Sequence, residues 1–129
     1  MDILLYLSKK DGVGAQLKSI IESLPFGEKL EVYNSIESLD IRLRNTLYEA
    51  AIAVLLADTK EALSRIYTIG HLLNEISIIL IIPDQDEDTI RKAHTLRPRF
   101  LTYKDSNFKD VAAVLEKLFK KECSKQFLI

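Results

Sequence analysis

Ala51-Ala-Ile-Ala-Val-Leu-Leu-Ala-Asp58 is the stretch of sequence that decides the fold. It is an apolar run that ends in a single acid. A run of this length predicts a strand buried on both faces, as in a parallel sheet that is covered by helices. In such sheets, ligands and reacting groups lie just beyond the carboxyl ends of the strands. Asp58 therefore lies where a functional site is expected.

The rest of the chain alternates between strand-like and helix-like patterns. Four further segments have the polarity pattern and length of strands, and they are Ile3–Leu7, Lys29–Tyr33, Ser77–Ile82 and Phe100–Tyr103. Five helices are predicted from apolar residues at helical spacing, and the inward-facing residues of these helices lie within 17–24, 36–43, 63–76, 90–93 and 108–119. Asn34, Asp58 and Asp84 are each followed three residues later by a glutamate. This spacing predicts that they begin the second, third and fourth helices.

This order of elements predicts the fold class. Five strands alternate with five helices across short connections, and right-handed crossovers then favour an α/β fold with a parallel sheet. We expect a three-layer, doubly wound, five-stranded parallel sheet with helices on both faces. One domain is predicted over residues 1–122, followed by an irregular carboxyl-terminal tail over residues 123–129.

Composition limits the classes of function. The chain has 129 residues, of which 47% are hydrophobic and 29% are charged, as in an ordinary globular domain. Its 18 basic and 19 acidic residues give a net charge of −1, so no nucleic-acid partner is predicted. The amino-terminal segment carries Asp2 and is too short for a signal peptide or a membrane span. The single cysteine, Cys123, cannot form an internal disulfide, and a cytoplasmic protein without a membrane partner is expected.

The pattern resembles the receiver domain of two-component response regulators, which has a flavodoxin-like fold with strand order 2-1-3-4-5. The central strand that ends in Asp58 is similar to the strand that presents the phosphate-accepting aspartate. The spacing from Ile82 to Lys104 is similar to the spacing between the receiver's conserved hydroxyl residue and its conserved lysine. The resemblance covers residues 1 to about 122 and implies functional positions at Asp58 and Lys104.

Several positions depart from the receiver pattern. A receiver carries a pair of acids after its first strand that helps to hold Mg²⁺, a cation that prefers oxygen ligands. This strand-end loop has Ser8 and Lys9 instead, and Asp11 is its first acid. Ile82 replaces the switch hydroxyl, and Leu101 replaces the aromatic residue of the last strand. The resemblance therefore implies a degenerate receiver, or pseudo-receiver.

The roles of Asp58 and Lys104 stay open at this point. Asp58 either accepts a phosphoryl group or caps the third helix, and its spacing to Glu61 favours the cap. Ala57 is an alternative for the acceptor position, one residue earlier. Lys104 either forms a salt bridge with Asp58 or is a solvated loop lysine.

Other motifs have simpler explanations than a site. The segment Lys10–Gly14 lacks the Lys-Ser/Thr pair of a phosphate-binding loop and is predicted to be a turn before the first helix. The acids between Asp84 and Asp88 complement the dipole of the helix that they begin. His71 and His94 have no His or Cys at ligand spacing, so we predict no metal and no cofactor.

We expect a non-enzymatic signalling or regulatory module that acts through protein–protein contacts. The resemblance implies that the contact face consists of the last strand and the helices on either side of it. Receivers commonly use this face for dimers and effectors, so a homodimer is one expected assembly. The alternatives are a response regulator receiver that accepts phosphate on Asp58 in a two-component phosphorelay, a small anion-binding domain, and a domain of a longer protein.

Overall fold

A single parallel sheet forms the middle layer of the protein. The computed structural model describes residues 2–8, 12–45, 51–74, 76–105 and 108–126. Within these residues, five strands lie in the order β2-β1-β3-β4-β5, which confirms the predicted flavodoxin-like α/β topology. The strands are β1 (Asp2–Leu7), β2 (Leu30–Tyr33), β3 (Ala51–Leu56), β4 (Ser77–Ile82) and β5 (Phe100–Tyr103).

The central strand is β3, and it pairs on both edges. It pairs in register with β1, from Asp2 opposite Ala51 to Leu7 opposite Leu56, and on its other edge with β4. Side chains from Ile52 to Ala57 are at most 3% exposed, because helices cover both faces of the sheet. An apolar residue is therefore needed at every one of these positions.

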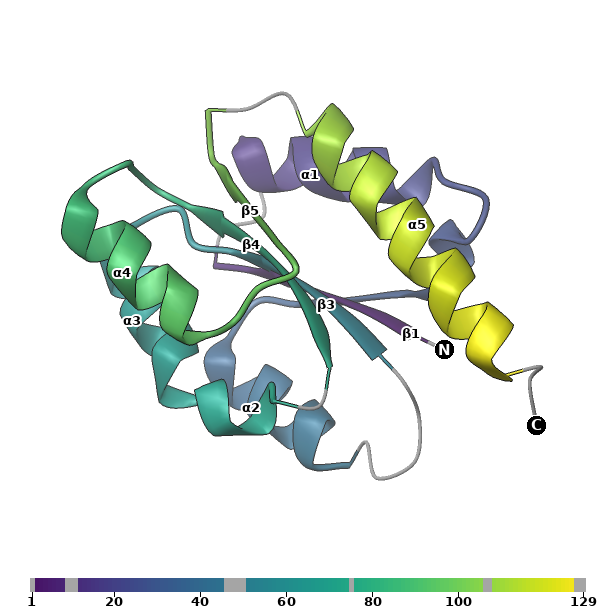
Figure 1. Cartoon of the computed structure of the whole chain (residues 1–129), viewed down its shortest axis with the longest axis horizontal. Helices are drawn as coiled ribbons and strands as arrows, with labels where there is room; N and C mark the ends of the chain where they lie inside the picture. The colour runs from purple at the N-terminus through teal and green to yellow at the C-terminus, as the bar shows by residue number, and fades with distance from the viewer. Residues whose placement is uncertain (1, 9–11, 46–50, 75, 106–107, 127–129) are drawn as a thin grey trace.

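The helices cover the two faces of the sheet unequally (Figure 1). One core lies under α2, α3 and α4, and a second core lies under α1 and α5. Alternation along each strand divides its side chains between the two cores, so Leu4 and Tyr6 belong to the first and Leu5 and Leu7 to the second. The helices are α1 (Val13–Glu22), α2 (Ile36–Arg44), α3 (Lys60–Thr68), α4 (Glu87–Thr95) and α5 (Lys109–Gln126), with 3₁₀ turns η1 (Gly27–Lys29) and η2 (Gly70–Leu72). No helix in the described ranges is long and apolar enough to cross a membrane.

Helices α2 and α3 begin one residue later than predicted. The N-cap residues are Ser35 and Thr59, not Asn34 and Asp58. Each N-cap is extended, and its hydroxyl oxygen accepts a hydrogen bond from the backbone N–H three residues later, at 3.2 Å and 3.1 Å respectively. Asp58 is therefore available for a contact elsewhere.

Two helix ends also differ from the prediction. Helix α3 ends at Thr68, so Leu73 and Ile76 pack against the core from the connection to β4 and not from a helix. Helix α5 continues to Gln126, beyond the predicted start of the tail at residue 123. The last three residues of the predicted tail lie outside the described residues.

Candidate functional site

Asp58 lies where β3 leaves the sheet. The N–H of Ala57 donates to the carbonyl oxygen of Ile81 at 2.8 Å, so Ala57 still pairs as a strand residue. Ala57 is fully buried, whereas Asp58 is half-buried. Asp58 is thus the first residue after β3 whose side chain reaches the carboxyl edge of the sheet.

The carboxylate of Asp58 is bound by the end of β1. The hydroxyl of Ser8 donates a hydrogen bond to Oδ1 of Asp58 at 2.8 Å, across 50 positions of sequence. A hydrogen bond to a carboxylate is stronger than one between neutral groups, so this contact ties the ends of β1 and β3 together. The predicted capping role of Asp58 is wrong, because Thr59 caps α3 and Asp58 binds Ser8 instead.

Lys104 ties the ends of β3 and β5 together. Its N–H donates to the carbonyl oxygen of Ile82 at 3.0 Å, which continues the pairing of β5 with β4. Its Nζ donates to the main-chain carbonyl oxygen of Asp58 at 3.2 Å. This half-buried lysine thus reaches Asp58, as one of the two predictions required, but it binds the backbone and not the carboxylate.

A pocket of about 440 Å³ opens beside these contacts. Eight residues from the ends of β3 and β5 and from the start of α1 line it, namely Gly12, Val13, Gly14, Leu56, Asp58, Thr59, Lys104 and Asp105. Gly12 has φ +61° at the start of α1, a backbone conformation that favours glycine. The first turn of α1 has no acid, and no side chain caps it, so the pocket combines helix amides, one ammonium and two carboxylates.

The acids that follow β4 organise the starts of α3 and α4. The N-cap of α4 is Asp86, which corrects the prediction for Asp84. A hydrogen bond from Thr89 and then one from the backbone N–H of Asp86, at 3.0 Å, lower the pKa of Asp84. Lys60, in the first turn of α3, lies 2.7 Å from a carboxylate oxygen of Asp86. These contacts give the acidic segment a structural role at two neighbouring helix starts.

The two predicted switch positions lie in the core beneath α2, α3 and α4. Ile82 is fully buried and pairs with Tyr103. Leu101 is half-buried and pairs with Leu80. Both Ile82 and Leu101 therefore contribute to packing.

The remaining predicted site residues add no further cluster. Lys9 and Asp11 lie outside the described residues. His71 is on η2 and His94 is on α4, and both are exposed. In the part of the chain that is described, no three His, Cys, Asp or Glu residues are grouped so that they could hold a metal ion.

The sequence interpretation missed Tyr6, which lies two residues before Ser8 on β1. Its side chain is 1% exposed, and its hydroxyl makes no hydrogen bond to any described residue. Burial raises the pKa of this hydroxyl, and the nearby guanidinium of Arg65 opposes that rise. The signal in the sequence was the one polar side chain in the apolar run Ile3–Leu7, because a buried hydroxyl needs a partner.

Comparisons with known proteins find no match to this chain. The chain matches no protein-family model, no curated protein and no solved structure. The fold is therefore assigned from its own sheet topology, and the site from its own contacts.

Proposed function

We propose that this chain is a receiver-like regulatory module that acts by protein–protein contact in the cytoplasm and performs no catalysis. In this proposal, Asp58 and Lys104 occupy the positions of the phosphate-accepting aspartate and the conserved lysine. They hold the strand ends in one arrangement and do not respond to phosphorylation. The proposal extends the resemblance in sequence pattern to the contacts at the carboxyl edge of the sheet.

The hydrogen bond between Ser8 and Asp58 is the observation that carries this proposal. Phosphoryl transfer to a carboxylate needs a metal ion to neutralise the charge that develops, and Mg²⁺ is held chiefly by carboxylates. Ser8 replaces one of those carboxylates with a hydroxyl that already donates to Asp58 at 2.8 Å. Lys104 donates to the backbone of Asp58, so in this arrangement it does not stabilise charge on the carboxylate.

The packing of Ile82 and Leu101 supports the same proposal. A phosphorylation switch needs two arrangements of similar free energy, and the phosphoryl group must favour one of them. Ile82 is fully buried and has no hydroxyl that could bond to a phosphoryl group. Leu101 has no polar atom to exchange between the core and the solvent. The output face is therefore expected to stay in one conformation.

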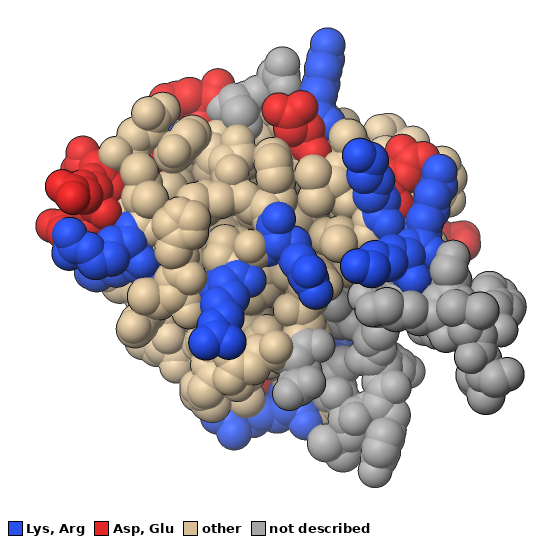
Figure 2. Space-filling view, in the orientation of Figure 1, with Lys and Arg blue, Asp and Glu red and all other residues tan. Residues whose placement is uncertain are grey.

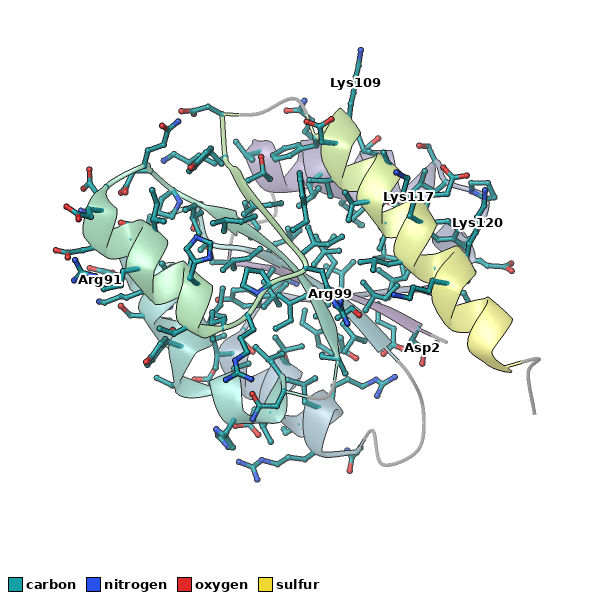
Figure 3. The ribbon with its side chains drawn as sticks, viewed as in Figure 1. Asp2, Arg91, Arg99, Lys109, Lys117 and Lys120 are labelled. Atoms are coloured by element: carbon teal, nitrogen blue, oxygen red, sulfur yellow. The ribbon has the colours of Figure 1, made fainter. Side chains whose placement is uncertain are left out.

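The face formed by α4, β5 and α5 is the proposed contact surface. Among the described strands, β5 is at the edge of the sheet and pairs only with β4, so one side of its backbone is open to a partner. Figure 2 shows acidic side chains with basic neighbours at the left margin of this face, where α4 begins, and mainly basic side chains across its centre and right, with some acidic side chains among them. Figure 3 places Arg99 near the centre of the face and Lys117 and Lys120 along α5.

This separation of charge suits a homodimer. A two-fold axis that crosses this face diagonally, at right angles to the line from the start of α4 to the second half of α5, would place these two segments of neighbouring copies opposite each other. Glu87 and Asp88, in the first turn of α4, would then face Lys117 and Lys120 of the second copy. Charge complementarity of this kind orients an interface and speeds association.

Phosphorylation of Asp58 is the alternative function that one observation favours. The carboxylate of Asp58 and the ammonium of Lys104 line the same pocket, so a phosphoryl group has space there. The test is incubation with acetyl phosphate, or with beryllofluoride and Mg²⁺, followed by intact-mass and NMR measurements. Our proposal expects no stoichiometric modification at Asp58, and stoichiometric modification would make the alternative the better account.

Partner binding provides the second test. The probe is the homodimer, or a protein captured by the immobilised chain, and its affinity is measured by titration calorimetry. We expect Asp58→Asn to change the binding free energy by no more than about 0.5 kcal/mol, as for an ordinary surface substitution. Arg99→Glu should weaken binding about tenfold or more. Lys29→Glu, on the exposed turn before the opposite edge strand β2, is the matched control and should have no effect. A tenfold effect of Asp58→Asn in a folded protein would contradict the proposal.

A further inference from the structure

A second groove lies over the end of β1, between the start of α2 and the body of α3. It has a volume of about 260 Å³ and is lined by Tyr6, Ser8, Asn34, Ser35, Ile36, Glu37, Arg65 and Thr68. These residues come from β1, from the turn that follows β2, and from α2 and α3. The groove is smaller than the roughly 300–1,000 Å³ of a pocket for a drug-sized ligand, so it suits a small molecule.

The buried hydroxyl of Tyr6 belongs to this groove. Tyr6 is 1% exposed, and none of the described residues bonds to its hydroxyl. Leaving a buried hydroxyl without a partner is costly, so native structures meet this need with protein, water or ligand atoms. Since the described protein atoms do not meet it, the partner of the Tyr6 hydroxyl is expected inside the groove.

Two opposite charges, those of Arg65 and Glu37, also line this groove. Among the residues that the structure describes, neither the guanidinium of Arg65 nor the carboxylate of Glu37 forms an ion pair. Burial raises the pKa of the Tyr6 hydroxyl most, Arg65 lowers it, and Asp58 and then Glu37 raise it, so all three charges lie near this hydroxyl. The carboxylate of Asp58 already accepts from Ser8 and does not line the groove, which leaves Arg65 and Glu37 for a ligand. The amide of Asn34 makes no side-chain hydrogen bond to a described residue either. The other hydroxyls already have partners, because Ser8 donates to Asp58 and Thr68 donates to the carbonyl oxygen of Arg65 at 2.6 Å.

The charges that line the groove indicate which class of ligand it can bind. Glu37 repels a simple anion such as phosphate, and Arg65 repels a simple cation. A small molecule with one negative and one positive group can pair with both at once. The planar guanidinium of arginine suits a carboxylate, to which it can donate two parallel hydrogen bonds. A protonated amine suits the carboxylate of Glu37.

We propose that the groove binds a small zwitterion, an α-amino acid, with its carboxylate on Arg65 and its ammonium on Glu37. The hydroxyl of Tyr6 at the floor and the amide of Asn34 at the rim bond to the polar atoms of the same ligand. This proposal goes beyond the regulatory function proposed above and does not depend on it, because the groove is on the α2–α3 side and not on the α4–β5–α5 face.

The test is a titration of the full chain with the standard α-amino acids, each up to about 10 mM, followed by NMR. At least one of them should give saturable shifts at the amides of Ser8, Asn34 and Arg65, with a dissociation constant of roughly 10 µM to 1 mM. For the tightest-binding amino acid, the amine without its carboxylate and the hydroxy acid without its ammonium should each bind at least tenfold more weakly. An uncharged polyol, glycerol, should not saturate.

Substitutions then assign the contacts. Arg65→Gln and Glu37→Gln should each weaken binding at least tenfold, and both residues are exposed, so the fold should be retained. The matched controls are Arg99→Gln and Glu28→Gln, which lie outside the groove and should leave binding unchanged. Tyr6→Phe should weaken binding several-fold and leave the melting temperature of the free protein equal or higher, because it removes a buried hydroxyl to which no described residue bonds.

Three results would overturn the proposal. If no α-amino acid saturates, the groove holds water only. If the hydroxy acid or glycerol binds as tightly as the amino acid, the ligand class is wrong. If Arg65→Gln and Arg99→Gln have equal effects, the ligand binds elsewhere on the protein.

Discussion

Removing Arg42 tests the polar network that joins α2 to the first two strands. The guanidinium of Arg42 lies 2.8 Å from a carboxylate oxygen of Asp2 and 2.9 Å from one of Glu31. The hydroxyl of Tyr33 donates to the same oxygen of Glu31 at 2.6 Å. The side chain of Arg42 is only 17% exposed, so solvent screens these contacts less than it would on an open surface.

The expected cost of Arg42→Met lies between two limits. Exposed ion pairs contribute about 0–1 kcal/mol, and breaking a fully buried pair costs about 3–5 kcal/mol. Asp2 and Glu31 are 28% and 35% exposed, so we expect a loss of about 2 kcal/mol in the free energy of unfolding. Methionine keeps the apolar stem of the side chain, so the measurement reports the charge and its hydrogen bonds.

The pH dependence of the stability difference between parent and Arg42→Met shows whether Glu31 is the partner that matters. Hydrogen bonding from Arg42 is the main cause that lowers the pKa of Glu31 below its ordinary value near 4.5. A lowered pKa in the folded state gives stability that is complete above the unfolded pKa and is lost as the pH falls through the folded value. The difference between parent and Arg42→Met should therefore be constant above about pH 5.5 and should shrink as the pH falls below about 4.

Urea denaturation at several pH values measures this difference. The matched control is Arg44→Met on the same helix, where an exposed ion pair with Asp40 should contribute no more than about 0.5 kcal/mol. Equal midpoints for the two variants would refute the assigned role of Arg42. A difference that stays constant down to pH 3 would refute the role of Glu31.

Two further substitutions test the packing of α5 and the end of α4. Leu115 is fully buried, so Leu115→Ala should lower the free energy of unfolding by about 2–5 kcal/mol, and the same change at half-buried Leu118 should lower it by less. Denaturant midpoints equal to that of the parent would show that the assigned contacts of α5 are wrong. Arg97 is exposed, follows α4 and has φ +53°, so Arg97→Gly should stabilise the protein by up to about 1 kcal/mol. A lower melting temperature would mean that the arginine side chain contributes a stabilising contact of its own.

The fold could be predicted from the sequence because many residues carry the same information. Each residue from Ile52 to Ala57 is buried, so the apolar run reports a strand covered on both faces even if one position varies. The alternation of strands and helices then allows few topologies, since crossovers between parallel strands are right-handed. The lengths of the helices were less predictable. Leu73 and Ile76 keep the spacing of a buried stripe, although α3 ends before them, at Thr68.

The groove between α2 and α3 could not be predicted, because its residues are distant in the sequence. Glu37 and Arg65 are both exposed and look like ordinary helix-surface charges when each helix is considered alone. Only the packing of α2 and α3 over the end of β1 brings them to one groove with Tyr6. The buried tyrosine was the one local signal, and it indicates a polar requirement without indicating a ligand.

The contacts of Asp58 show why a site is harder to predict than a fold. The segment from Asp58 to Ala62 offers two possible N-caps, since Asp58 and Thr59 each have a side-chain oxygen that can bind the helix amides. Local sequence favoured Asp58, because of the glutamate three residues later. The structure uses Thr59, because Ser8 lies across the sheet edge at hydrogen-bond distance from Asp58. That single contact depends on the pairing of β1 with β3, and it turns a helix cap into a link between strand ends. Many residues together determine the fold, so one misread residue leaves the fold prediction unchanged, whereas the geometry of this site depends on the single contact between Ser8 and Asp58.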